Sequence, residues 1–297
     1  MKILVTGSSG MIGSALVIKL KNEGYDVDCL DIVSQKYHKY GTIIHDLRQP
    51  ITGQSHYDLV VHLAANARVH DLVVDPEKAL DNIKMTHNIL EFCRKNKIPK
   101  FLFASSREVY GNTNFSVWEG YGSQSDSKNV YTSSKVAGES YCHAYRECYG
   151  IDTIITRFSN VYGRFDESNR FIPKAIETLK KNETFTIYGD NKILDFTYLD
   201  DCIDGIFHII KFWDSDLKLS EFKEFNIASG EKSKLEDVAT ILKYLLKSES
   251  NIVVGDRLAG ELDTFQADIN RMGAVFGWRP KTTLTEGLEK TIQYYAS

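Results

Sequence analysis

A short apolar run followed at once by a glycine-rich turn opens the chain, and this pattern limits its possible folds more than any other. Residues 2–6 (KILVT) predict a buried strand and residues 14–22 predict a helix. The turn between them, residues 6–13 (TGSSGMIG), therefore joins a strand to a helix. A junction of this kind is typical of the first unit of a parallel nucleotide-binding sheet.

The three glycines of this turn have separate physical roles. Gly7 permits a sharp turn, Gly10 lets the backbone approach a pyrophosphate, and Gly13 allows the helix to pack closely on the strand. The free N–H groups at the start of the helix would bind that anion. Two further residues of the turn are candidates for the same cofactor site: Met11 and Ile12.

Asp31 closes a second strand-like run, residues 26–31, about twenty residues beyond the turn. A carboxylate here accepts hydrogen bonds from the adenosine ribose and repels a 2′-phosphate, so the sequence favours NAD over NADP. Ile32, which follows, is a candidate for the same site. The alternative for Asp31 is an ordinary polar residue at the end of a strand.

The remaining apolar runs predict the fold class. Residues 58–64 and 100–105 read as strands, and a long helical pattern covers residues 76–97 between them. Strands that alternate with helices imply right-handed crossovers and a parallel sheet covered on both faces. We therefore expect an α/β protein with a Rossmann-type, doubly wound parallel sheet.

A change in pattern after residue 157 predicts a second, smaller domain. The chain has 297 residues, which is the length of about two domains. We expect an NAD-binding domain in residues 1–165, to which residues 197–212 return. Residues 166–297 would then form mainly a C-terminal α/β substrate domain.

Composition excludes several classes of function. The formal charge is −4, and the 36 basic and 40 acidic residues are mixed along the chain. The sequence contains no basic block for nucleic acid or a membrane surface and no membrane-spanning apolar run. Its five cysteines are scattered without a CxxC pair, which predicts neither disulfides nor a metal site. A soluble, cytoplasmic, globular protein is expected.

A candidate catalytic pair begins a later helical stretch. Tyr131 and Lys135 lie four residues apart in VYTSSK, so both side chains share one face of the helix. An ammonium group beside a phenol lowers the pKa of the phenol, as a tyrosine acting as a base near neutrality requires. This spacing alone also occurs by chance.

Taken together and in order, these motifs resemble the extended short-chain dehydrogenase/reductases, in particular the NAD-dependent nucleotide-sugar epimerases and dehydratases. Further matching stretches run nearly to the end of the chain: HLAA (62–65), SSREVYG (105–111), RFSNVYG (157–163), DFTYLDD (195–201) and AD (267–268). UDP-glucose 4-epimerases are the most similar branch.

The resemblance implies roles for the catalytic residues. Tyr131 would remove the proton from the sugar 4-hydroxyl while the C4 hydride passes to the nicotinamide. Lys135 would hold the nicotinamide ribose, and Ser106 would hydrogen-bond the reacting oxygen.

The resemblance also implies further binding residues. Additional cofactor-site candidates are Asp46, Leu47, Leu63, Ala64, Ala65, Asn82 and Phe158. The substrate-site candidates are Ser106, Arg107, Asn160, Phe171 and Arg257. Packing in the strand end or the helix is the alternative for residues 63–65 and for Asn82.

Arg107 and Glu108 depart from the pattern of the 4,6-dehydratases, which carry Asp-Glu at this place. An arginine is a poor general acid because it stays protonated. Elimination of water thus loses its most direct proton donor. Glu108 could still act as a base near C5, or it could form a structural ion pair with Arg107. Arg107 is a candidate for recognising a carboxylate or another polar group on the sugar.

Leu194 is a second departure, because many relatives carry a diphosphate-binding arginine there. Arg257 and Arg164 are candidates to replace it, and Arg68 is a candidate to reach the sugar or the phosphates.

The sequence therefore predicts an NAD-dependent nucleotide-sugar 4-epimerase, acting on a UDP-hexose through a transient 4-keto sugar. The alternatives are a 4,6-dehydratase or a uronate decarboxylase that uses Glu108, and a net 4-dehydrogenase. By resemblance we also expect a homodimer in which helices 76–97 and 131–149 form a four-helix bundle.

Overall fold

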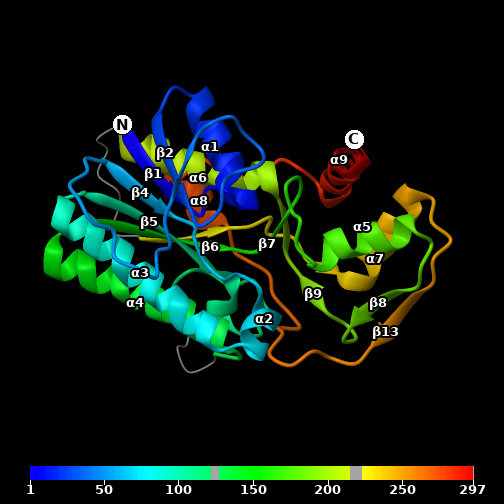
Figure 1. Cartoon of the computed structure of the whole chain (residues 1–297). Helices are drawn as coiled ribbons and strands as arrows, with labels where there is room; N and C mark the ends of the chain where they lie inside the picture. The colour runs from blue at the N-terminus through cyan, green and yellow to red at the C-terminus, as the bar shows by residue number, and fades with distance from the viewer. Residues whose placement is uncertain (122–126, 215–222, 297) are drawn as a thin grey trace.

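A computed structural model describes residues 1–121, 127–214 and 223–296. Its main body is a seven-stranded sheet with all neighbouring strands parallel, in the order β11-β6-β5-β4-β1-β2-β3. Figure 1 shows this sheet and the helices that flank it on the left, and a smaller body on the right. The strands of the sheet are β1 (Lys2–Thr6), β2 (Asp26–Asp31), β3 (Thr42–Ile44), β4 (Leu59–His62), β5 (Lys100–Ser106), β6 (Asp152–Phe158) and β11 (Glu224–Ile227).

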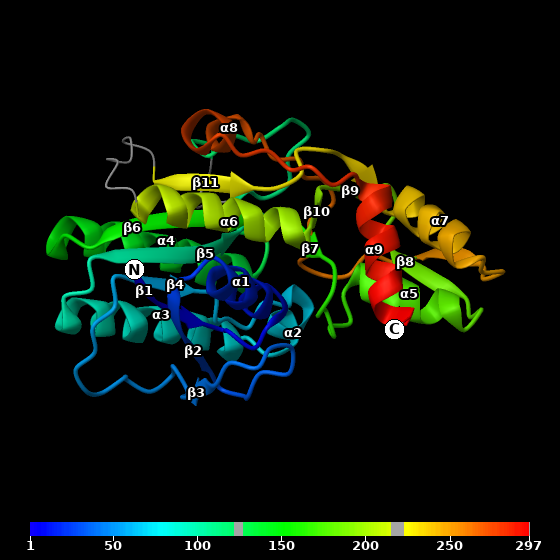
Figure 2. The ribbon, with the colours of Figure 1, turned by 90° about the horizontal axis from the view of Figure 1, so that it is seen from above.

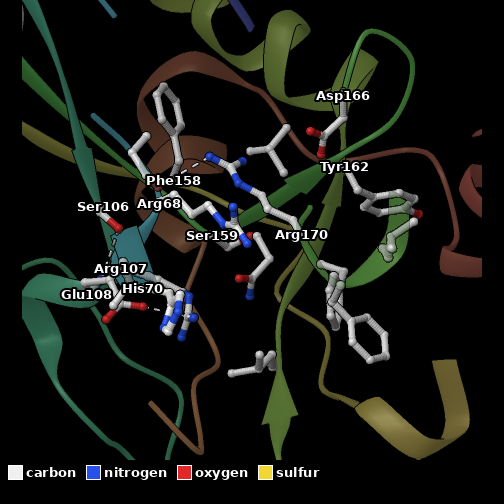
Figure 3. A pocket seen from close by; sticks show the side chains of 18 of the residues that line it. Arg68, His70, Ser106, Arg107, Glu108, Phe158, Ser159, Tyr162, Asp166 and Arg170 are labelled. Carbon is white, nitrogen blue, oxygen red and sulfur yellow. Dashed lines mark hydrogen bonds and ion pairs between the residues drawn. The ribbon is translucent and has the colours of Figure 1, made fainter. Parts of the chain in front are cut away.

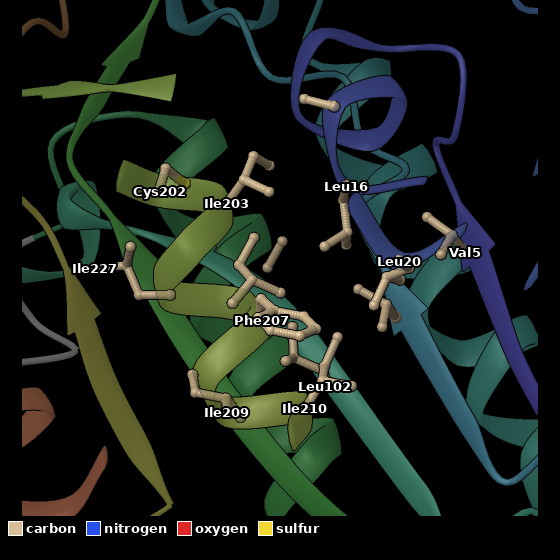
Figure 4. Packing of buried hydrophobic residues seen from close by; sticks show 14 of the residues in the cluster. Val5, Leu16, Leu20, Leu102, Cys202, Ile203, Phe207, Ile209, Ile210 and Ile227 are labelled. Carbon is tan, nitrogen blue, oxygen red and sulfur yellow. The ribbon is translucent and has the colours of Figure 1, made fainter. Parts of the chain in front are cut away.

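Helices cover both faces of this sheet, which explains why its strands are almost wholly apolar. Ile3 and Val5 pack on one face, whereas Leu4 between them packs on the other, because successive strand residues point in opposite directions. The first face is covered by α1 (Met11–Asn22) and α6 (Leu199–Asp214), whose side chains meet in Figure 4. The second face is covered by α3 (Glu77–Asn96) and α4 (Val130–Tyr149).

The strand order changes direction beside β1. The chain goes from β1 to β2 and β3 on one side, and continues with β4, β5 and β6 on the other. Ligands of open parallel sheets bind outside the carboxyl ends of the strands at such a point. The glycine turn after β1 and Ser106 at the end of β5 both lie there.

The smaller body has a separate apolar core and lies beside the carboxyl ends of the sheet (Figure 2). Its helices are α5 (Phe171–Lys180), α7 (Leu235–Leu246) and α9 (Leu284–Ala296). Its paired strands are β8 (Phe185–Tyr188) with β13 (Ile252–Gly255), β7 (Asn160–Tyr162) with β10 (Phe196–Tyr198), and β9 (Ile193–Leu194) with β12 (Ser233–Lys234).

The structure confirms the predicted doubly wound parallel sheet. Beyond residue 165, α6 packs on α1, β11 adds a strand beside β6, and the short helix α8 (Asn270–Phe276) packs on β11. The predicted return of residues 197–212 did not include β11 or α8, because segments of four and seven residues carry too little periodicity to recognise. Among the described residues, no helix has the length and apolar character needed to cross a membrane.

Candidate active site

A cavity of about 770 Å³ lies between the carboxyl ends of the strands and the smaller body. One wall contains the glycine turn with Ser106 and Phe158, and the other contains residues of α5, β8 and α7. Figure 3 shows Ser106, Arg107 and Glu108 on one side, Tyr162 and Asp166 on the opposite side, and Arg170 between them. The cavity can therefore hold a ligand that contacts both bodies.

The backbone of the glycine turn packs so tightly that side chains at Gly7 and Gly13 would not fit. Gly7 has φ +68°, and a Cβ atom there would lie 2.6 Å from the backbone nitrogen of Ala64. A Cβ at Gly13 would overlap the carbonyl oxygen of Gly7. Gly10 caps α1 without a side-chain hydrogen bond, so the first N–H groups of the helix face the cavity free of such a cap. This backbone cradle fits the pyrophosphate of a dinucleotide.

Asp31 holds the turn from the end of the neighbouring strand. Its carboxylate accepts hydrogen bonds from the backbone nitrogens of Ser9, at 2.9 Å, and Ile32, at 2.7 Å. The carboxylate thus lies beside the glycine turn, where a dinucleotide's ribose follows its pyrophosphate.

Tyr131 and Lys135 face the cavity from one side of α4, as their spacing predicts. The Lys135 ammonium donates to the carbonyl oxygen of Ala104 at 2.8 Å and lies 5.8 Å from the centroid of the Tyr131 ring. Ser106, at the end of β5, lines the cavity beside Tyr131 and acts to lower the pKa of its phenol. The Ser106 hydroxyl also accepts from the backbone nitrogen of Glu108 at 3.2 Å.

The pKa of Tyr131 differs from the sequence expectation. Burial raises it to about 12, although hydrogen bonding to Ser106 and the charges of Arg170 and Arg107 act to lower it. In the protein alone, burial disfavours the phenolate more than the neighbouring charges favour it, so the depression expected from Lys135 stays a prediction for the loaded enzyme. Burial lowers the pKa of Lys135 to about 8, against the opposing charge of Glu139.

Glu139 continues the face of Tyr131 and Lys135 and anchors a buried ionic network. Its carboxylate accepts from Arg157 at 2.9 and 2.7 Å and from the Ser105 hydroxyl at 2.5 Å. Arg157 also donates to the Tyr110 hydroxyl at 3.0 Å. These contacts join α4 to the ends of β5 and β6, directly behind Ser106.

Replacing Glu139 with Gln is expected to lower the free energy of unfolding by about 3 kcal/mol, because Arg157 stays buried without its carboxylate. Loss of this charge also lowers the pKa of Lys135, so an alkaline loss of activity due to Lys135 deprotonation moves to lower pH. Urea unfolding and the pH profile of kcat measure the two effects. The control is Glu147→Gln on the exposed side of α4, which should change stability by less than about 0.5 kcal/mol. Equal behaviour of the two variants would contradict the assignment.

Arg107 and Glu108 form an ion pair inside the cavity wall. Arg107 Nη2 lies 3.0 Å from Glu108 Oε1, and both residues are buried. The Asn129 amide donates to the other Glu108 oxygen at 3.3 Å. The structural ion pair considered for Glu108 is thus present, although its side chain still lines the cavity.

The structure brings most of the predicted site residues to this cavity. Those that line it are Gly7, Gly10, Met11, Ile12, Gly13, Leu63, Ala65, Ser106, Arg107, Glu108, Tyr131, Lys135, Phe158, Asn160 and Phe171. The predicted residues outside its lining are Asp31, Ile32, Asp46, Leu47, Ala64, Asn82 and Arg257.

Several of the residues outside the lining have protein partners. The Asp46 carboxylate accepts hydrogen bonds from the Arg48 guanidinium, and Leu47 packs in the core under α3. The Asn82 side chain bonds both backbone groups of Asn66. The exposed Arg257 pairs with two carboxylates of its own body, those of Asp190 and Asp263.

The cations that line the cavity differ from those proposed to replace the missing arginine at position 194. Arg164 pairs with Asp200, and neither Arg164 nor Arg257 lines the cavity. Instead Lys192 lines it, buried and paired with Glu261, together with Leu194. Lys192 directly precedes β9 and lies two positions before Leu194, the spacing of residues on one side of an extended chain, which could have identified Lys192 from the sequence. Arg170 and Lys174 were also missed, and no pattern marked them.

Known proteins are similar to this chain over most of its length. Residues 3–228 match the model of the NAD dependent epimerase/dehydratase family. A putative UDP-glucose 4-epimerase of Methanocaldococcus jannaschii is 32% identical over 309 residues, covering 98% of this chain and 97% of the relative. UDP-glucuronic acid decarboxylase 1 of Danio rerio is 27% identical over 314 residues, covering 99% of this chain and 72% of the relative.

Solved structures are similar over the whole chain. The UDP-glucose 4-epimerase of Thermus thermophilus, in complex with NAD, superposes with a TM-score of 0.87. It is 26% identical, and the match covers 100% of this chain and 99% of that structure.

Proposed function

Because this chain belongs to the NAD-dependent epimerase/dehydratase family, with NAD as its cofactor, we propose that it is a nucleotide-sugar 4-epimerase acting on a UDP-hexose. The observation that carries this proposal is that the residue after Ser106 is an arginine, Arg107, which forms an ion pair with Glu108. Ser106, Tyr131 and Lys135 line the same cavity. The UDP-sugar named for the relative from Methanocaldococcus supports the substrate class.

The glycine turn, Asp31 and Lys135 would hold NAD. The turn is so tight that a Cβ atom at Gly13 would overlap it, and this close backbone packing suits a pyrophosphate site. When bound, NAD supplies a cationic ring that accepts a hydride from the sugar carbon and returns it. Tyr131 takes the proton of the sugar 4-hydroxyl and later gives a proton back to the same oxygen. Ser106, which lines the cavity with Tyr131, donates a hydrogen bond to that oxygen while its proton moves.

Arg107 disfavours loss of water from the 4-keto sugar. Protonating the departing hydroxyl requires an acid, and a guanidinium does not give up its proton at neutral pH. The Glu108 carboxylate forms an ion pair with Arg107 and accepts a hydrogen bond from Asn129. A lyase would need this carboxylate free to act as a base. The residues next to Ser106 thus favour return of the hydride over elimination.

A lyase is the second candidate, since Glu108 lines the cavity and a relative is named a decarboxylase. In this case Glu108 would leave its partners and take the C5 proton of the 4-keto sugar, or the keto group would drive loss of carbon dioxide. A net 4-dehydrogenase would release the 4-keto sugar instead.

Incubation in D₂O with UDP-, dTDP-, GDP- and CDP-sugars, without added NAD, distinguishes these reactions. We expect a 4-epimer of a UDP-hexose with no deuterium on carbon, because the hydride leaves and returns within the site. Mass spectrometry and proton NMR read the products. Loss of water or carbon dioxide with deuterium on the sugar would contradict the epimerase and favour the lyase. A single turnover that stops at a 4-keto sugar would indicate the dehydrogenase.

A further inference from the structure

Cationic side chains gather at the catalytic end of the cavity. Arg68, Arg107 and Arg170 line it together with Lys135, and Figure 3 shows Arg107 beside Glu108 and Arg68 near Arg170. Arg107 is paired with Glu108 inside the wall. The partner of Arg68, Asp71 at 3.4 Å, lies outside the lining. The sugar end therefore carries more positive than negative charge.

Arg107 has one hydrogen-bonding group to spare. The side chain is nine-tenths buried, and its Nη2 is engaged by Glu108 at 3.0 Å. Its Nη1 is enclosed and has no partner within the described part of the protein. A buried N–H without an acceptor is unfavourable, and a ligand oxygen would remove that cost. Glu108 thus fixes the guanidinium in one orientation and leaves Nη1 for a ligand.

Arg107 and Arg170 line the same cavity as the reacting group. Tyr131 and Ser106 line it as well, and Arg107 directly follows Ser106 in the chain. A substituent one carbon away from the reacting sugar carbon therefore comes within their reach when the 4-hydroxyl contacts Tyr131. On a hexose the nearest substituent of variable chemistry is the C6 group, attached to C5.

We propose that the hexose taken by this site carries a carboxylate at C6, and that Arg107 is the residue that selects this nucleotide-linked uronate. This inference rests on the proposed function of the same site and names its substrate class more closely. A planar guanidinium is well suited to a carboxylate, and a charge-assisted hydrogen bond is about twice as strong as a neutral one. A neutral C6 hydroxyl could also accept from Nη1, but it adds no negative charge opposite Arg107 and Arg170.

Titration calorimetry on the NAD-loaded protein tests the proposal with a matched pair of ligands, UDP-glucuronate and UDP-glucose. We expect UDP-glucuronate to bind about 10- to 100-fold more tightly, as one charge-assisted hydrogen bond predicts. Arg107→Gln should weaken UDP-glucuronate binding far more than UDP-glucose binding, so most of this preference should be lost. Arg164→Gln is the matched control, because Arg164 pairs with Asp200 outside the cavity lining.

The outcomes separate this inference from the proposed function. Equal affinity of the native protein for the two ligands would overturn the uronate preference and leave the UDP-hexose proposal standing. If neither ligand binds, both fail. An Arg107→Gln variant that keeps the preference would overturn the role of Arg107. If this variant does not retain NAD or a cooperative melting transition, Arg107→Lys replaces it, and its preference should fall because an ammonium lacks the planar fork.

Discussion

Replacing Tyr131 with Phe is expected to lower kcat by about 10³-fold or more, since proton transfer by a positioned side chain contributes roughly 10²- to 10⁴-fold. The ring and its packing stay in place, and only the hydroxyl that faces Ser106 is lost. NAD should remain bound, because the glycine turn and Asp31 are untouched. Steady-state kinetics and the NAD content of the purified variant measure the two properties.

Tyr149→Phe is the matched control for this change. Tyr149 ends the same helix, and 54% of its surface is exposed, far from the cavity lining. It should keep native turnover. Native turnover of the Tyr131 variant would show that another group moves the proton. Loss of NAD together with activity would instead indicate a structural role for the hydroxyl.

The raised pKa of Tyr131 places a further requirement on its role as a base. In the protein alone burial raises its pKa to about 12, so almost all of it is protonated near neutrality. Because a phenol must lose its proton to act as a base, the bound cofactor and substrate have to supply the positive charge that lowers this pKa. We therefore expect the NAD-free protein to show phenolate absorbance from Tyr131 only at strongly alkaline pH.

Local patterns made much of the fold predictable. The apolar runs at the strands and the glycine turn each depend on consecutive residues, and the structure contains β1, β2, β4, β5 and a helix directly after the turn. Tyr131 and Lys135 likewise share a face because helical spacing fixes it. The predicted homodimer and the domain division at residue 165 stay predictions.

Contacts between distant segments could not be predicted in the same way. Lys192 meets Glu261 across 69 residues, and Arg157 meets Glu139 from a separate strand. The pKa of Tyr131 also depends on burial by the whole fold, which no local spacing encodes. Asn82 illustrates the opposite case, since its place near the cofactor was expected but its amide is taken by Asn66.

Replacing Gly13 with Ala is expected to abolish NAD retention and to lower the free energy of unfolding by about 1–3 kcal/mol, as overpacking does. The added Cβ would overlap the Gly7 carbonyl oxygen and lie 2.8 Å from the Gly7 carbonyl carbon and from Ser8 Cα. These are backbone atoms that cannot rotate away, so α1 must move off the turn. The N–H groups at the start of α1 then no longer converge on one anion.

Gly41→Ala is the control for Gly13→Ala, because a Cβ there meets nothing within 4 Å and its backbone does not require glycine. It should keep NAD and change stability by less than about 0.5 kcal/mol. Release of nucleotide on denaturation gives the NAD content, and urea unfolding gives the stability. A Gly13 variant that is destabilised but keeps its NAD would show that close packing of α1 supports the fold without shaping the anion site. Loss of NAD together with the loss of stability would link cofactor binding to the backbone geometry of this turn.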